Sequence, residues 1–98
     1  MDTYQIVLKT SAVDDLDGLR KHHATQIADA IERHLQHGPT KEGKTRIKRL
    51  RGISNPDYRL RIGDYRAFYT VDEEAGRVDV LRIMHKDETH SYYEELTR

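Results

Sequence analysis

Three arginines are concentrated in one nine-residue stretch, YRLRIGDYR, at residues 58–66. Its two halves alternate apolar and charged residues, and the Gly-Asp pair between them is typical of a two-residue β-hairpin turn. A turn of that length sets Arg61 opposite Arg66 and places Arg59 on the same face, because side chains alternate along a strand. Guanidinium groups donate paired hydrogen bonds to phosphate oxygens. The hairpin therefore predicts a cluster of cations suited to a polyanion.

The pairing of like charges across the hairpin needs a reason, because it destabilises an antiparallel pair by about 0.2–1 kcal/mol. Two interpretations stay open. In the first, the arginines lie on a solvated face and are neutralised by Asp57, Asp64 or Asp79. In the second, the face binds a ligand, and Phe68, predicted on the same face, offers its ring to a nucleic-acid base.

The charge distribution favours the second interpretation, in which the arginine face binds a ligand. The 98 residues include 17 basic and 17 acidic side chains, so the net charge is zero. Residues 44–68 nevertheless hold eight cations and two anions, a local charge of +6. A positive field at one face is compatible with a neutral whole. We expect RNA to be bound by Phe68 and by the basic run before the hairpin, which comprises Lys44, Arg46, Lys48, Arg49 and Arg51.

The flanking sequence predicts the elements that hold the hairpin. A strand is expected over residues 4–9, a short helix after it, and a second helix over residues 20–37, where apolar residues recur with helical spacing. Residues 40–48 are polar and read as a loop. After the hairpin, a third strand of the meander is expected over 78–84, and a short helix over 89–96. This order predicts a single α+β domain over residues 1–98, with a four-stranded antiparallel sheet, helices on one face and a short C-terminal helix.

The turn between the last two strands bears on a further candidate. If residues 73–76 form a four-residue loop, Val71 pairs with Val78 and His85 comes onto the arginine face near Asp64. A one-residue change in that loop would reverse this placement.

Composition excludes several classes of site. The chain has no cysteine, which removes thiolate nucleophiles and zinc–thiolate centres and fits a reducing compartment. No phosphate-cradling glycine-rich loop and no complete set of metal ligands is evident, so neither a cofactor nor a metal is expected. The N-terminus is not that of a signal peptide and no stretch is apolar enough to cross a membrane, so we expect a cytoplasmic protein with no membrane partner.

The second half of the chain resembles a known family. "LRG" at residues 50–52, followed by "YRLRIGDYRAFYTVDEEAGRVDVLRIMHKDETHSYYEEL", resembles the RelE/ParE superfamily of toxins of type II toxin–antitoxin systems, in its RelE branch. The resemblance covers residues 50–96 closely, and the helical hairpin before it fits in layout.

The resemblance implies a function. A RelE-like toxin is a ribosome-dependent mRNA endonuclease that inhibits translation and is held inactive by a cognate antitoxin. Its chemistry is the metal-free attack of a ribose 2′-hydroxyl on the adjacent phosphate. The family positions fall on Arg59, Arg61, Arg66 and Lys86, and the family tyrosine falls on Tyr92 or on Tyr93. Since arginine is a poor proton carrier, His85 is expected to move protons together with the tyrosine.

Two other functions stay open. The ParE branch shares the scaffold and often this hairpin, but inhibits DNA gyrase by binding it, without cutting RNA. The third possibility is a module that only binds an antitoxin. The six histidines are interpreted as exposed side chains rather than metal ligands, because no carboxylate completes a set.

Overall fold

The described part of the chain forms one five-stranded sheet with three α-helices. The computed structural model describes residues 3–43 and 46–98. Its elements are β1 (Gln5–Leu8), α1 (Thr10–Asp17), α2 (Lys21–Leu35), β2 (Ile47–Arg49), β3 (Tyr58–Ile62), β4 (Tyr65–Asp72), β5 (Arg77–His85), the 3₁₀-helix η1 (Lys86–Glu88) and α3 (Thr89–Leu96). The strand order is β1-β5-β4-β3-β2. The α+β class is confirmed, and the terminal helix has the bounds expected from the sequence.

The sheet differs from the expected one in two respects. A fifth strand, β2, pairs antiparallel with β3 in a segment that the sequence had indicated as loop. In addition, β1 runs parallel to β5, with Ile6 opposite Val78 and Leu8 opposite Val80, so the sheet is mixed rather than antiparallel. The helical hairpin between β1 and the meander carries the chain back across the sheet, which allows the parallel pairing.

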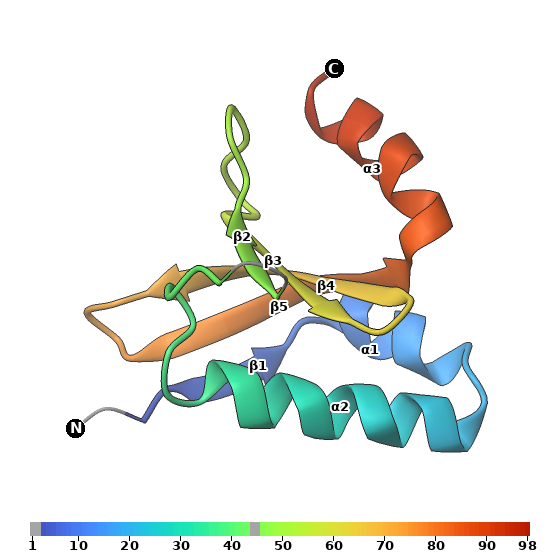
Figure 1. Ribbon diagram of the computed structural model, residues 1–98, viewed down its shortest axis with the longest axis horizontal. Coiled ribbons are helices and arrows are strands. Elements are labelled where there is room, and N and C mark those ends of the chain that lie inside the picture. The colour runs from blue at the N-terminus through green and yellow to red at the C-terminus, as the bar shows by residue number, and fades with distance from the viewer. Residues whose placement is uncertain (1–2, 44–45) are drawn as a thin grey trace.

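Two apolar clusters lie on opposite sides of this sheet. Helices α1 and α2 cover one face, where Ile27, Ile31 and Leu35 of α2 pack against Leu60 and Val80 of the strands. Helix α3 rises from the other side (Figure 1). It packs over a smaller cluster comprising Phe68, Met84, Tyr92, Leu50, Tyr93 and Leu96. The expectation that the helical hairpin covers one face is therefore confirmed, and α3 packs on the other face.

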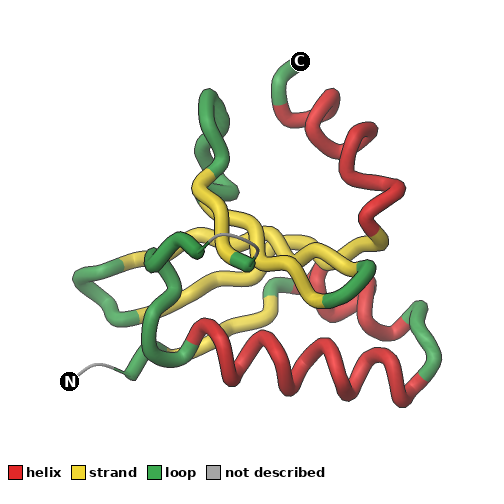
Figure 2. Tube along the Cα trace, viewed as in Figure 1, coloured by secondary structure: helices red, strands yellow, loops and turns green. Residues whose placement is uncertain are grey.

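Two segments, α3 and the loop between β2 and β3, extend from the second side of the sheet. Figure 2 shows the loop between β2 and β3 standing off the sheet on the same side as α3. Gly52 in this loop has a φ of 73°, a conformation that favours glycine, and the Asn55–Pro56 peptide bond is cis. Among the described residues, no helix has the length and apolar character to cross a membrane.

Candidate functional site

The β3–β4 hairpin has the register that its turn predicts. Arg61 pairs with Arg66, and Arg59 pairs with Phe68, so the three arginines share the side of the sheet on which α3 lies. Gly63 in the turn has a φ of 58°, as such a tight turn requires. Arg61 is exposed, while Arg59 and Arg66 are partly buried. We call Arg59, Arg61 and Arg66 the arginine cluster.

No ion pair joins an acidic residue to the arginine cluster within the part of the chain that the structure describes. Asp79 is engaged by Arg77 at 3.0 Å, and the carboxylate of Asp64 lies 3.7 Å from the Lys86 ammonium. Asp57 accepts a 3.4 Å hydrogen bond from the Asn55 N–H. Asp57, Asp64 and Asp79 thus make no ion pair with the arginine cluster, although Asp64 is near enough to Arg66 to raise its pKa.

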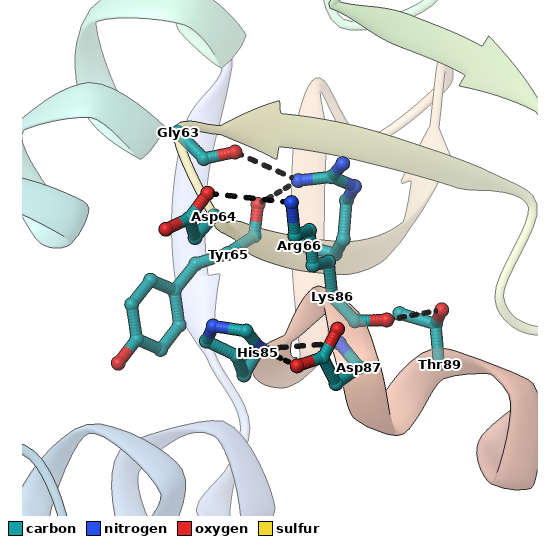
Figure 3. Close-up of polar contacts among 8 residues, drawn as sticks. All are labelled: Gly63, Asp64, Tyr65, Arg66, His85, Lys86, Asp87 and Thr89. Carbon is teal, nitrogen blue, oxygen red and sulfur yellow. Dashed lines mark hydrogen bonds and ion pairs between the residues drawn. The ribbon is translucent and has the colours of Figure 1, made fainter.

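Arg66 is anchored to the turn that precedes it. Its Nη1 donates 2.9 Å hydrogen bonds to the carbonyl oxygens of Gly63 and Tyr65 (Figure 3). Burial, reinforced by the charges of Arg59 and Arg61, lowers the pKa of Arg66 from its ordinary value, whereas Tyr93 and Asp64 raise it. The guanidinium groups are thus close enough to repel one another, and an anion placed among them would relieve that repulsion.

Arg59 adds a further sign of an incomplete site. Its Nε is buried and has no hydrogen-bond partner within the described chain. Leaving a buried charged donor unpaired is costly, and such groups are uncommon in native structures. The arginine cluster therefore has unused donors as well as unbalanced charge.

Phe68 does not have the role that the sequence indicated. Its side chain is fully buried under α3, with its ring centre 4.8 Å from that of Tyr92 and 5.8 Å from that of Tyr93 in edge-on arrangements. The expectation that Phe68 offers a stacking surface to a base is therefore wrong for this structure. The ring instead forms the floor on which α3 sits.

The two tyrosines of α3 have different surroundings. Tyr92 is only 9% exposed and lies over the guanidinium of Arg82, and its burial raises its pKa. Tyr93 is partly exposed and close enough to Arg66 to affect its pKa. Of the two, Tyr93 is the tyrosine that the structure brings to the arginine cluster.

His85 lies on the side of the sheet opposite to the one expected. Val71 does pair with Val78, but Leu81 is an extra residue in β5, since Tyr69 faces Val80 while Phe68 faces Arg82. This bulge shifts the register by one, so that His85 faces Tyr65.

The contacts of His85 are with Tyr65 and with the start of η1, not with the arginine cluster. Its ring meets that of Tyr65 edge-on at 5.4 Å, and its Nδ1 accepts a 3.1 Å hydrogen bond from the Asp87 N–H at the start of η1 (Figure 3). The expectation that His85 joins the arginine face is wrong.

Lys86, the residue after His85, does reach the hairpin turn. Its N–H donates a 2.7 Å hydrogen bond to the Asp64 carbonyl, and its Nζ lies 3.7 Å from Asp64 Oδ1. Figure 3 shows the Lys86 side chain directed toward the same turn as Arg66. Its side chain is 51% exposed, so its ammonium is open to a ligand.

The basic run before the hairpin divides into separate environments. Lys48 pairs with Arg59 across β2 and β3, which extends the arginine cluster by one exposed cation. Arg49 donates to the Tyr58 hydroxyl at 3.0 Å, and its guanidinium carbon lies 5.4 Å from the centre of that ring. Arg46 is exposed and helps to lower the pKa of His34 on α2. Arg51 is exposed in the β2–β3 loop, while Lys44 lies outside the described residues.

Two relations at the site were not found from the sequence. The alternation of cations with Ile47 in β2 was the available sign that Lys48 would join the arginine face. No sequence pattern marks Arg82, which stands alone among apolar residues, and only the bulge at Leu81 places it on the side of α3. The assembled site has the three guanidinium groups of the arginine cluster, the ammonium groups of Lys48 and Lys86, and the phenol of Tyr93. That combination can hold a phosphodiester, stabilise added negative charge on it, and exchange protons with it.

Comparison with known proteins places this geometry in a family context. A family model described as the ParE toxin of the type II toxin–antitoxin system, parDE, matches residues 6–90. The chain is similar to a chain of the RelBE2 toxin–antitoxin complex from Mycobacterium tuberculosis, with 27% identity, a TM-score of 0.75, and coverage of 87% of this chain and 93% of that one. No curated protein sequence matches the chain.

Two further structures support the fold alone, since their identity is lower. The RelB–RelE antitoxin–toxin complex from Methanococcus jannaschii is similar at 23% identity, with a TM-score of 0.65 and coverage of 89% of this chain and 98% of that one. The isolated E. coli RelE toxin is similar at 19% identity, with a TM-score of 0.61 and coverage of 95% and 99% respectively.

Proposed function

We propose that this chain, which belongs to the ParE toxin family of type II toxin–antitoxin systems within the RelE/ParE superfamily, is a ribosome-dependent endoribonuclease that cleaves mRNA and so inhibits translation. The observation that carries the proposal is the arginine cluster, which makes no ion pair with an acidic residue in the described chain and has Tyr93 and Lys86 at its border. A surface that only stabilised the fold would not keep Arg61 opposite Arg66.

The bonds that form and break in the proposed reaction all belong to the mRNA, which the ribosome presents to the protein. The 2′-oxygen of a ribose attacks the adjacent phosphorus, and the bond from that phosphorus to the 5′-oxygen of the next nucleotide breaks. One proton leaves the 2′-hydroxyl and another reaches the 5′-oxygen. The products are a 2′,3′-cyclic phosphate and a free 5′-hydroxyl.

The arginine cluster acts at the step in which the negative charge on the phosphate is greatest. The phosphorus passes through a five-coordinate arrangement with extra negative charge on its oxygens, and guanidinium groups already in place stabilise that charge without reorganising. Arg59, Arg61 and Arg66 fill this role, and their fixed charge makes them poor at moving protons. Tyr93 and Lys86 border the cluster and carry exchangeable protons, so we assign the proton transfers to them.

Inhibition of DNA gyrase is the second candidate function. The observation that favours it is the matching family model, which describes a ParE toxin. The placement of His85 away from the arginine face also removes one group that the nuclease was expected to use. A gyrase inhibitor would use the same basic surface to bind a protein and would need no tyrosine at Arg66.

Two assays separate the candidates. In a reconstituted translation system, the nuclease predicts new 5′ ends within the mRNA only when ribosomes are present, with a cyclic phosphate on the upstream fragment. In a supercoiling assay, the same protein leaves gyrase active. Loss of supercoiling with intact mRNA would reject the nuclease in favour of the gyrase inhibitor. If the protein is inactive in both assays, the remaining possibility is a module that only binds an antitoxin.

A cognate antitoxin is the proposed protein partner, consistent with the similar structures of RelB–RelE and RelBE2 complexes. We expect it to supply acidic side chains to the arginine cluster and apolar side chains to the grooves beside the helical hairpin. Reversing the charge at Arg61 or Arg66 should therefore weaken the complex and make its dissociation less dependent on salt.

A further inference from the structure

Arg82 of β5 joins parts of the fold that are distant in the sequence. Its Nε donates to Asp15 Oδ2 at 2.8 Å and its Nη2 donates to Asp15 Oδ1 at 3.2 Å, so a two-pronged ion pair connects β5 with α1. The same Oδ2 accepts a 2.8 Å hydrogen bond from the Ile83 N–H. The two side chains are 34% and 19% exposed, which shields the pair from solvent screening more than an ordinary surface pair.

The same guanidinium also contacts α3. The guanidinium carbon of Arg82 lies 5.6 Å from the ring centre of Tyr92, the distance of a cation–π contact. Tyr92 in turn packs edge-on against Phe68. Helices α1 and α3 leave the same end of the sheet on opposite sides (Figure 1), and Arg82 contacts both of them.

Helix α3 depends on this support because it is short. It has eight residues, and isolated helices below about 12–15 residues are marginal in water. Its contacts with the sheet pass largely through Tyr92 and Tyr93, which pack on Phe68. Tyr93 follows Tyr92 directly, so the packing of Tyr92 on the sheet determines the position of Tyr93 relative to Arg66.

We propose that the Asp15–Arg82 ion pair is a positioning clamp, which fixes Arg82 under Tyr92, keeps α3 docked on the sheet and so holds Tyr93 beside the arginine cluster. Arg82 and Asp15 are positioning residues that touch no substrate. Their importance for cleavage rests on the proposed function, whereas their effect on α3 does not.

The clamp can be tested by the direction in which the pKa of Tyr92 changes when Arg82 is replaced. Burial raises the pKa of Tyr92 above its ordinary value, Arg82 lowers it, and Glu95, Asp15 and Tyr93 raise it. If α3 stays docked without Arg82, loss of the positive charge raises this pKa further. If α3 leaves the sheet, the ring becomes solvated and the pKa falls toward its ordinary value of about 10.

The measurement is tyrosine ¹³Cζ NMR on the Arg82→Gln variant, with the Tyr92 signal assigned from Tyr92→Phe. We expect the pKa of Tyr92 to fall. A rise in that pKa would show that α3 docks without the clamp and would overturn the proposal.

Hydrogen exchange provides a second test with a gentler variant. Asp15→Asn keeps an oxygen to accept from the Ile83 N–H but removes the charge that holds Arg82. We expect amide exchange in α3 to accelerate by about tenfold or more, with α2 unchanged. Unchanged exchange in α3 would contradict the clamp even if Arg82→Gln failed to fold.

A matched control lies at the other end of the same strand. Arg77 also donates through Nε and Nη2 to one carboxylate, that of Asp79, at 3.0 and 3.4 Å, and the structure shows no aromatic contact for it within the described residues. Arg77→Gln should leave both the pKa of Tyr92 and the exchange of α3 unchanged. If it reproduced the effects of Arg82→Gln, those effects would reflect general loosening of the sheet and the clamp would be rejected.

The catalytic consequence is measured separately. In single-turnover cleavage on mRNA-programmed ribosomes, Asp15→Asn should lower the rate by about tenfold and leave ribosome affinity unchanged, because the arginine cluster is untouched. A loosened α3 with a normal cleavage rate would reject the positioning of Tyr93. A wild-type protein that cuts no mRNA would reject the proposed function, while the NMR and exchange results would still decide whether the clamp exists.

Discussion

Replacement of Arg61 by glutamine should make the protein more stable and less active at once. Arg61 is exposed, has no hydrogen-bond or ion-pair partner through its side chain in the described chain, and lies directly opposite Arg66. Arg61→Gln therefore removes a repulsive charge without removing a stabilising contact. It also removes one of the three guanidinium groups proposed to stabilise the reacting phosphate.

The expected magnitudes follow from the cross-strand geometry. Relief of a like-charge pair in an antiparallel sheet is worth about 0.2–1 kcal/mol, which for a domain of this size raises Tm by about 1 to 8 °C. The gain should shrink toward zero in 1 M salt, where charges are screened within about 3 Å. Loss of a preorganised charge at the reacting phosphate should lower the cleavage rate by about 10²–10³-fold.

The assay pairs thermal unfolding at low and high salt with mRNA cleavage on programmed ribosomes. Arg77→Gln is the matched control, since it removes a partly exposed arginine of the same sheet that is paired with Asp79 rather than opposed to a cation. We expect the control to have an unchanged or lower Tm and to cleave mRNA at the normal rate.

Either of two results would refute the reasoning. A lower Tm for Arg61→Gln in dilute buffer would mean that Arg61 makes a stabilising contact instead of facing a repulsive one. Wild-type cleavage by the same variant would mean that the reaction takes place away from the arginine cluster.

Three further predictions concern single side chains. Tyr93→Phe should lower mRNA cleavage at least tenfold while Tyr92→Phe leaves it within about twofold, because only Tyr93 borders Arg66; the reverse order in a cleavage assay would reassign the site. Burial lowers the pKa of His34, so the folded state binds fewer protons than the unfolded state, and stability should fall as pH drops through about 6.5; His34→Gln should flatten this part of the Tm–pH curve. Tyr69→Phe should cost about 1–3 kcal/mol in urea unfolding, because the buried Tyr69 hydroxyl donates to Pro39 O at 2.6 Å, and a cost near zero would contradict that account.

The bulge at Leu81 shows how one residue redirects a site. It occurs where β1 ends opposite Val80 and α1 takes over the edge of β5 through Asp15, which accepts from Ile83 N–H. Nothing within β5 itself marks the extra residue, because it depends on packing against elements distant in the sequence. The length of the local loop alone therefore predicts the wrong face for His85.

The sheet shows the same contrast between local and distant determinants. The parallel pairing of β1 with β5 joins Gln5 to Arg77, and β2 forms a strand of three residues by pairing with β3. A three-residue strand in a polar, basic segment has too weak a pattern to be recognised alone. Its pairing partner supplies the hydrogen bonds that make it a strand.

The amino-acid sequence by itself determined the arginine cluster and the elements of local origin. A two-residue turn leaves one register for the hairpin, so Arg61 must face Arg66, and the spacing of apolar residues defines α2. Tertiary structure alone decided that Phe68 is covered, that Tyr93 rather than Tyr92 is near enough to Arg66 to affect its pKa, and that Arg82 lies under α3. Turn geometry and periodicity act between neighbours in the chain, whereas docking of α3 and the shifted register of β5 arise from contacts between residues that only folding brings together.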